Sequence, residues 1–238
     1  MIPVEPAPEP STFHDAVRVP GERAVAEMVG KRPKHPRGSG KPFIQRKKKI
    51  ILADGSSTEA LITREDELPS SDFPDYWKEA LDDLMEAYDQ ICAFSCFRIH
   101  RVTGARSVDH MAPKSRHWKK IYEWSNYRLC CSTMNARKRD FSDVLDPFEV
   151  GADWFELELV GFQVLPAPGL DATIREQVLK TIERLGLNDA KSRQSRTRDA
   201  EFYESGEISF RFLQQESPFV ARELRRQGCL RPEDSSTA

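Results

Sequence analysis

The sequence predicts an α+β chain, with a strand hairpin and helix as a small core inside a mainly helical domain, behind a flexible N-terminal arm. Apolar residues recur at helical spacing over 74–91 and 170–187. Runs with strand composition meet at turn dipeptides, at Asp54-Gly55 within 46–64 and at Val160-Gly161 further on. The predicted regions are an arm over 1–42, a β-hairpin over 43–70, a core with its leading helix over 71–150, and a hairpin with charged helices and a frayed tail over 151–238.

The predicted arm contains eight of the sixteen prolines and little apolar periodicity, which is typical of a flexible or loosely docked segment. The whole chain is 39% hydrophobic and 31% charged, and no apolar run reaches the length of a membrane span. Its N-terminus does not read as a signal peptide. We therefore expect a cytoplasmic protein without membrane contact. An odd number of cysteines, five, argues against a disulfide framework.

Positive charge is concentrated in two stretches, although the net charge is only −2. Residues 31–53 hold nine Lys or Arg and no acid, and residues 114–139 hold eight Lys or Arg against the single acid Glu123. Each stretch alone is better explained as a solvated loop. Together they predict a polyanionic partner, because a near-neutral chain has concentrated its bases.

The second basic stretch follows a predicted strand–strand–helix unit. Residues 97–110 predict a hairpin that turns at Thr103-Gly104, Pro113 ends it, and a helix is expected over 131–141. A histidine can act as a general base near neutral pH. Carboxylate and amide oxygens are hard ligands that suit Mg²⁺ or Mn²⁺. The unit carries all of these groups, in Asp109, His110, Asn126, Asn135 and Lys138. A one-metal phosphodiesterase uses groups of the same kinds.

Three phrases in this unit, VDHMAPKS, WSNYRLCC and STMNARK, resemble the ββα-metal motif of HNH endonucleases, also called His-Me finger nucleases. The resemblance covers roughly residues 88–147. It implies a ββα-metal core and a metal-dependent endonuclease that hydrolyses phosphodiester bonds of nucleic acid, with DNA as the expected substrate. By position, Asp109 and Asn135 would hold Mg²⁺ or Mn²⁺, His110 would be the general base, and Asn126 would brace its loop.

The bases around the motif are the expected contacts to the nucleic-acid backbone. Lys138 also matches a basic residue that lies near the phosphate in that family. The predicted nucleic-acid-binding residues are Lys114, Arg116, Lys119, Lys120, Arg137, Lys138 and Arg139.

Many HNH proteins also hold a structural Zn²⁺ with two Cys-x-x-Cys pairs. Here Ser95 stands where a partner of Cys92 would fall, and Met134 where a partner of Cys131 would fall. Structural zinc takes four soft or imidazole ligands. We therefore expect no structural zinc and cysteines that pack as small hydrophobic residues. A rearranged site that uses Cys92, Cys96, Cys130 and Cys131 stays open as the alternative.

The distal part of the chain loosely resembles small HNH proteins that accompany an ATPase in anti-phage systems of the Septu and retron types. The resemblance rests on the segment DATIREQVLKTIERLGLN and the charged helical tail after it. It implies an antiviral effector held by a partner ATPase through the charged C-terminal helices and the N-terminal arm. Two other functions stay open. One is an HNH-like module that binds nucleic acid without cutting, and the other is a stand-alone restriction or homing nuclease. The latter is disfavoured because no helix-turn-helix or zinc-finger pattern is present to read bases.

Overall fold

The computed structural model describes residues 1–235, so the last three residues of the predicted tail lie outside the described residues. Helices and small antiparallel strand pairs occur together, in agreement with the predicted α+β class. The chain forms two compact units, and one of the points where it passes from one to the other lies between Asp109 and His110. Unit 1 comprises Met1–Ala7, Leu84–Asp109 and the chain from Arg128 onward, and unit 2 comprises Pro8–Asp83 and His110–Tyr127.

The region predicted to be a flexible or loosely docked arm is helical over residues 14–28, more than its low apolar periodicity predicted. A π-helical segment, η1, spans His14–Arg18 and leads into α1, Val19–Met28. The buried apolar residues fall on one helical face, since Phe13, Val17, Ala24 and Met28 follow helical spacing. Phe13 packs edge-on against Trp124, with ring centroids 5.6 Å apart. The many prolines of this region argued against a helix in the sequence. Pro20, however, lies at the start of α1, where proline is tolerated.

The predicted hairpin over 46–64 is present in unit 2 as β1, Lys47–Ile51, and β2, Ser57–Leu61. The two strands pair antiparallel, with Lys49 opposite Glu59. Gly55 has φ of +82°, a value that favours glycine in the connecting turn. The short 3-10 helix η2, Glu65–Glu67, follows.

The helix predicted over 74–91 is shorter than expected. It begins as the 3-10 helix η3, Tyr76–Ala80, and continues as α2, Leu81–Ala87. It ends early because Asp89 and Gln90 both take positive φ, at 50° and 64°, which cannot continue a right-handed helix.

The strand pairing of the predicted core differs from the expectation. Residues 97–102 do not form a strand, and β3, Arg106–His110, pairs instead with β4, Tyr127–Cys131. The backbone N–H of Gly104 bonds back to His100 O at 2.8 Å in a tight local turn, so the preceding segment does not lie along β3. Helix α3, Ser132–Lys138, follows β4 directly. The strand–strand–helix unit is therefore β3, β4 and α3, with a loop holding η4, Trp118–Lys120, and η5, Trp124–Asn126.

The second predicted hairpin and the helix after it are confirmed in unit 1. Strands β5, Phe155–Leu157, and β6, Val164–Pro166, pair antiparallel. Helix α4 spans Ala172–Leu185, begins at an Asp171 side chain that accepts two backbone N–H bonds, and ends at Gly186 in the left-handed conformation.

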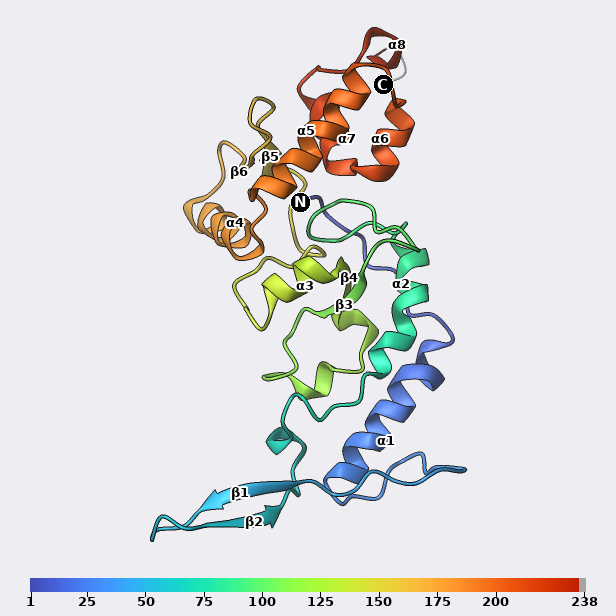
Figure 1. The fold of residues 1–238 in the computed structure, drawn as a ribbon, viewed down its shortest axis with the longest axis vertical. Helices are drawn as coiled ribbons and strands as arrows, with labels where there is room; N and C mark the ends of the chain where they lie inside the picture. Colours follow the sequence, from blue (N-terminus) through green and yellow to red (C-terminus); the bar gives the residue numbers. More distant parts are fainter. Residues whose placement is uncertain (236–238) are drawn as a thin grey trace. The chain divides into compact units, whose positions relative to one another are not determined.

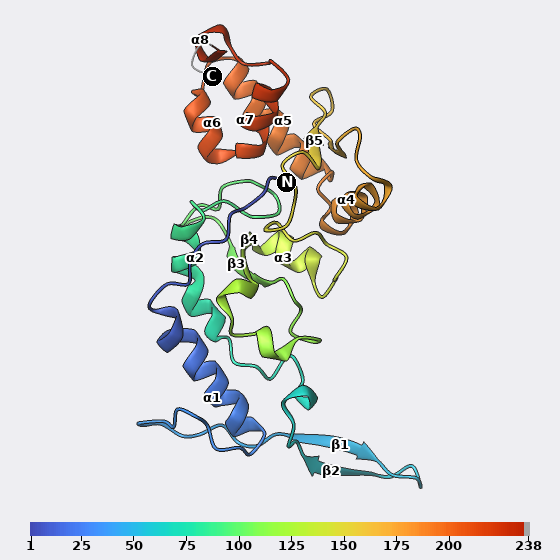
Figure 2. The same cartoon turned by 180° about the vertical axis from the view of Figure 1, so that it is seen from behind.

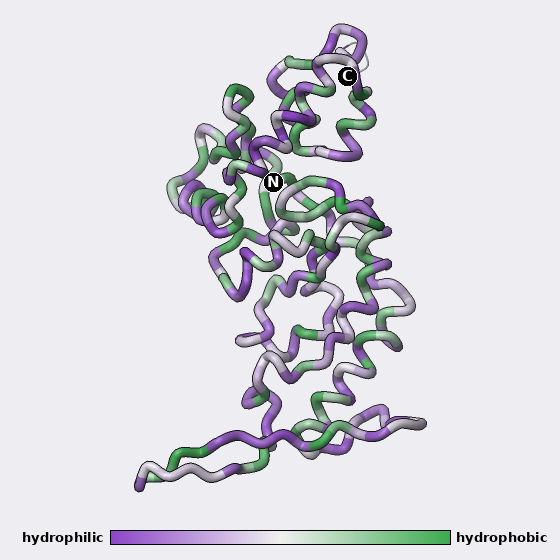
Figure 3. The backbone as a smooth tube through the Cα atoms, in the orientation of Figure 1, coloured by the Kyte–Doolittle hydropathy of each residue, from purple (hydrophilic) through white to green (hydrophobic). Residues whose placement is uncertain are grey.

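The C-terminal region is helical, as its composition predicted. Helix α5 spans Ala190–Glu204, α6 spans Phe210–Glu216, α7 spans Pro218–Arg226, and the short α8 spans Pro232–Ser235. Helices α5, α6 and α7 pack on one another (Figure 2). Their chain mixes hydrophilic and hydrophobic residues throughout (Figure 3), as expected of helices with one buried face. Across residues 1–235, no helix combines the length and apolar character needed to cross a membrane.

Candidate functional site

The two residues that drew attention in the sequence, Asp109 and His110, are the last two of β3. Their Cα atoms are therefore about 3.8 Å apart, and their side chains leave opposite faces of the strand. The Asp109 side chain joins a cluster within unit 1, and the His110 side chain joins a cluster within unit 2. Both are buried, with exposed fractions of 1% and 8%.

In unit 1, Asp109 faces a lysine. Lys138, in the last turn of α3, places Nζ 3.1 Å from Asp109 Oδ2, and its side chain is 0% exposed. This oxygen is buried and makes no hydrogen bond of good geometry, but the Lys138 ammonium supplies its counter-charge. Burial raises the pKa of Asp109 to about 6, and the nearby charges of Lys138 and Arg128 oppose that rise.

Asn135 is anchored to the same strand. Its Nδ2 donates to Ser107 Oγ at 2.6 Å and to Val108 O at 3.2 Å. An amide nitrogen carries two hydrogens, so these bonds use both and leave Oδ1 as the acceptor of the group. Asn135 and Lys138 are three residues apart on one face of α3, and both contact β3. The ribbon shows α3 beside β3 and β4 (Figure 1).

In unit 2, the His110 imidazole is held by a carbonyl and two aromatic rings. Its Nε2 lies 3.1 Å from Ile121 O. Trp77 and Tyr127 meet the imidazole edge-on, with centroids at 5.0 Å and 5.2 Å. A carbonyl oxygen only accepts, so Nε2 carries the proton in this contact and the lone pair of the neutral ring lies on Nδ1.

Asn126 ties together the loop that follows β3. Its Oδ1 accepts from Ala112 N at 2.7 Å, and its Nδ2 donates to Ala112 O and to Lys120 O. The backbone adds a bond from Met111 N to Asn126 O at 2.9 Å. The residue therefore braces the loop immediately after His110, which is the position that the resemblance implied for it.

The predicted nucleic-acid-binding residues do not share one environment. Arg116, Lys119 and Lys120 are exposed in unit 2. Lys114 lies with Nζ 4.0 Å from the centre of the Trp77 ring, a cation–π contact to the residue that flanks His110.

In unit 1, only Arg139 of the predicted bases is exposed. Arg137 pairs with Asp189 and donates to Leu185 O at 2.9 Å, so it holds α3 against the end of α4. Lys138 differs most from the expectation, because it is fully buried against Asp109 rather than open to a phosphate. The periodicity of a seven-residue helix could not show which of its bases points inward.

Several residues that shape the site were not identified from the sequence. Trp77 and Tyr127 enclose His110, but a helical or strand pattern only marks them as core. The imidazole contacts the backbone carbonyl of Ile121, so the type of side chain at this position could not predict the contact. Arg128, on β4, donates from Nε to Asp146 Oδ1 at 2.7 Å. A buried arginine of this kind could have been suspected only from its place in an otherwise apolar strand.

The cysteines near the motif are not arranged as a four-ligand site. Cys92, Cys96 and Cys130 are buried, and Cys131 is partly exposed. Within residues 1–235, no three side chains of His, Cys, Asp or Glu gather in a way that would hold a metal ion. The expectation that structural zinc is absent stays a prediction.

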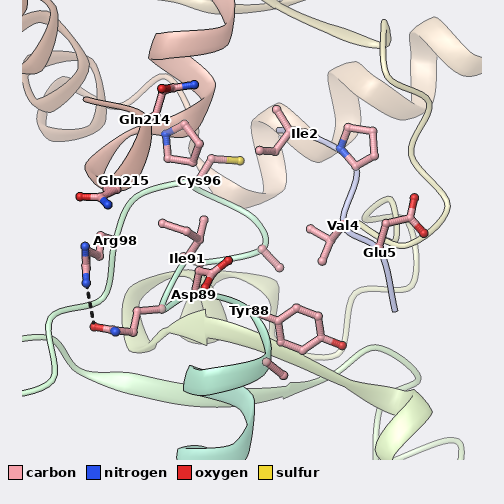
Figure 4. Close-up of a pocket in the computed structure, with 16 residues that line it drawn as sticks. Ile2, Val4, Glu5, Tyr88, Asp89, Ile91, Cys96, Arg98, Gln214 and Gln215 are labelled. Atoms are coloured by element: carbon pink, nitrogen blue, oxygen red, sulfur yellow. Dashed lines mark hydrogen bonds between the residues drawn. The ribbon is translucent and has the colours of Figure 1, made fainter. Parts of the chain in front are cut away.

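A separate cavity of about 630 Å³ opens in unit 1 (Figure 4). It lies between the N-terminal segment, the turn after α2 and helix α6, with Ile2, Asp89, Arg98 and Gln214 among its lining residues. None of the described residues that line it belongs to the predicted site.

Comparison of the chain with protein-family models gives no match, and comparison with curated proteins gives none either. The geometry of the Asp109 and His110 clusters and the motif resemblance are therefore the grounds for a function.

Proposed function

We propose that this chain is a metal-dependent endonuclease of the HNH type, which hydrolyses phosphodiester bonds of nucleic acid, with DNA as the expected substrate. One observation carries the proposal. Consecutive residues of β3 present a buried carboxylate oxygen without a hydrogen bond of good geometry, on Asp109, and an imidazole whose Nε2 is held on a carbonyl, on His110. A metal ligand and a general base need such differently aimed neighbours.

The residues around Asp109 fit a hard divalent cation. Asp109 Oδ2 is buried and makes no hydrogen bond of good geometry, and Asn135 is oriented through its nitrogen, which leaves its oxygen as the ligand atom. Two protein oxygens suffice for Mg²⁺, which usually keeps several waters. Asp109 and Asn135 would hold the ion. When bound, it would stabilise negative charge on the phosphoryl and leaving oxygens.

His110 supplies the base. With Nε2–H donated to Ile121 O, Nδ1 accepts a proton from a water molecule as the water oxygen attacks phosphorus and the bond to the leaving ester oxygen breaks. The Ile121 carbonyl then faces the N–H of a positively charged ring, which stabilises it. Asn126 holds the loop through Ala112 and Lys120, so the position of the base does not depend on a mobile segment.

The exposed bases of the loop suit the polyanionic substrate. Arg116, Lys119 and Lys120 are exposed on the loop that begins after His110. Contacts of this kind neutralise phosphates without reading bases. Lys138 is left out of the proposed binding surface because it is buried.

One observation favours a second candidate, a module that binds nucleic acid without cutting it. The Lys138 ammonium already gives Asp109 a counter-charge at 3.1 Å. In that case the ion pair would replace the cation in holding α3 on β3, and Asp109 would be structural.

Mn²⁺ binding separates the two candidates. We expect the full-length protein to bind Mn²⁺, followed by electron paramagnetic resonance of the free ion, and Asp109→Asn and Asn135→Ala to weaken binding by about tenfold or more. Asp140→Asn is the matched control, because Asp140 is an exposed acid just after α3. Equal Mn²⁺ binding by Asp109→Asn and the control would remove the metal assignment and favour the non-cutting module.

A protein partner is proposed only from the resemblance of the distal part to HNH proteins that accompany an ATPase. The nuclease would be an antiviral effector held by an ATPase, with α5, α6 and α7 as the docking helices. Co-purification with the product of an adjacent ATPase gene, abolished by deletion of residues from 190 onward, tests this part.

A further inference from the structure

The Cys92 sulfur of unit 1 lies against the backbone of Cys131 at the start of α3. The backbone N–H of Cys131 donates to Cys92 Sγ at 3.4 Å, and the N–H of Ser95 donates to the same sulfur at 3.5 Å. These hydrogen bonds hold the Cys92 sulfur beside residue 131.

The two thiols have different environments. Cys92 is fully buried, and burial raises the pKa of its thiol. The neighbouring Cys92 thiol and the start of α3 lower the pKa of the Cys131 thiol, while partial burial opposes that change. A thiolate on Cys131 would thus face a protonated thiol on Cys92.

The Cys131 sulfur can be reached by a small molecule. Cys131 is partly exposed and lines a cavity of about 280 Å³ within unit 1, together with Thr133, Ser192 and Ser195. A water molecule takes up about 30 Å³ of liquid, so a hydroperoxide fits this space. Cys92, by contrast, has no exposed surface.

We propose that Cys131 and Cys92 form a peroxide-sensitive thiol pair. A hydroperoxide is the oxidant. The Cys131 thiolate attacks one peroxide oxygen, the O–O bond breaks, and the other oxygen leaves and takes up a proton as water or an alcohol. Cys131 is then a sulfenic acid. The Cys92 sulfur attacks the Cys131 sulfur, the S–O bond breaks, and water leaves with the Cys92 proton. Two thiols are oxidised to one disulfide while the peroxide is reduced.

The other cysteines lack one or both of the needed features. Cys130 is buried, burial raises the pKa of its thiol well above the usual value, and its Sγ points to Ser107 O at 3.6 Å. Cys96 is buried, and burial raises the pKa of its thiol as well. Cys229 is exposed, but its thiol donates to Gln227 O and meets no second sulfur among the described residues. The inference does not depend on the proposed nuclease activity.

The test is oxidation of the purified full-length chain by hydrogen peroxide, read by mass spectrometry of peptides. In the wild type we expect a disulfide to join the peptides that contain Cys92 and Cys131 at peroxide levels that leave the exposed Cys229 reduced. Cys92→Ser should stop at the sulfenic acid, which dimedone then labels on Cys131. In Cys131→Ser, Cys92 should stay reduced.

Cys130→Ser and Cys229→Ser are the controls, since both should form the Cys92–Cys131 disulfide at the wild-type rate. The proposal is overturned if the wild type, which needs no substitution to be tested, forms no such disulfide at peroxide levels that oxidise Cys229. It is also overturned if dimedone labels Cys130 as readily as Cys131 in Cys92→Ser.

Discussion

Lys138 Nζ lies 3.1 Å from Asp109 Oδ2, and neither side chain has more than 2% of its surface exposed. This ion pair connects the last turn of α3 to the end of β3 inside unit 1. A buried charge without a partner is costly, so each residue depends on the other. A cation that binds near Asp109 would therefore also lie close to the positive charge of Lys138.

The first prediction concerns stability. Lys138→Met should lower the free energy of unfolding by about 3–5 kcal/mol, because it leaves the Asp109 carboxylate buried and unpaired. Asp109→Asn should cost less than Lys138→Met, because burial already favours the neutral form of this carboxyl group. The double variant should lose less than the sum of the two, as measured by urea unfolding at pH 7. Additive losses would mean that the two side chains do not interact as described.

The second prediction concerns pH. Burial raises the pKa of Asp109 to about 6, above the value of about 3.9 for an unfolded aspartate. The folded state therefore holds the proton more tightly, so the stability from this group is present below about pH 4 and disappears as the pH rises to about 6. The difference in unfolding free energy between the wild type and Asp109→Asn should change across that window. A difference that stays constant from about pH 4 to 7 would contradict the assignment.

The sequence predicted best those parts of the fold that local interactions determine. Helix α4 begins at the capping residue Asp171 and ends at Gly186, and both are local signals that a sequence displays. The β5–β6 pair likewise joins neighbouring segments.

The failures arose where distant parts of the chain compete with local patterns. Residues 97–102 were expected to pair with β3, but β3 pairs with β4, which lies beyond a long loop. Helix α1 was not predicted in full because the prolines around it argued against a helix. The helical spacing of Phe13, Val17 and Ala24 becomes informative only when the surface that buries these residues is known.

The candidate site was predictable in identity but not in environment. The motif singled out Asp109, His110, Asn126 and Asn135. That Lys138 turns inward, and that a backbone carbonyl holds His110, depends on packing of α3 and of the loop. No single residue type carries that information.

The third prediction concerns substrate binding. Lys119→Ala combined with Lys120→Ala should weaken binding of all nucleic-acid sequences alike. It should also reduce the slope of log affinity against log salt, by about 0.9 for each phosphate of duplex DNA that the variant no longer neutralises. Arg175→Ala with Lys180→Ala is the matched control, because it removes two exposed charges from α4. A wild-type slope in the first variant, or weakening of one sequence only, would show that the loop does not act through phosphates.

The fourth prediction concerns metals. Cleavage should need added Mg²⁺ or Mn²⁺ and stop with EDTA, because the ligand atoms of Asp109 and Asn135 are oxygens. The purified protein should hold far less than one zinc ion per chain, since Ser95 and Met134 cannot complete a thiolate site. Elemental analysis that finds stoichiometric zinc would favour a rearranged site among Cys92, Cys96, Cys130 and Cys131.

The central claim is that His110 is the base of a phosphodiester hydrolysis, and cleavage by its variant tests this most directly. The wild type and His110→Ala are compared on single-stranded and duplex DNA and RNA in Mg²⁺, with His100→Ala, an exposed histidine paired with Glu216, as the control. We expect His110→Ala to cut about 10²–10⁴ times more slowly, while it binds the substrate as the wild type does and unfolds cooperatively. Cleavage by His110→Ala at the wild-type rate, or no metal-dependent cleavage by the wild type of any of these substrates, would contradict the claim.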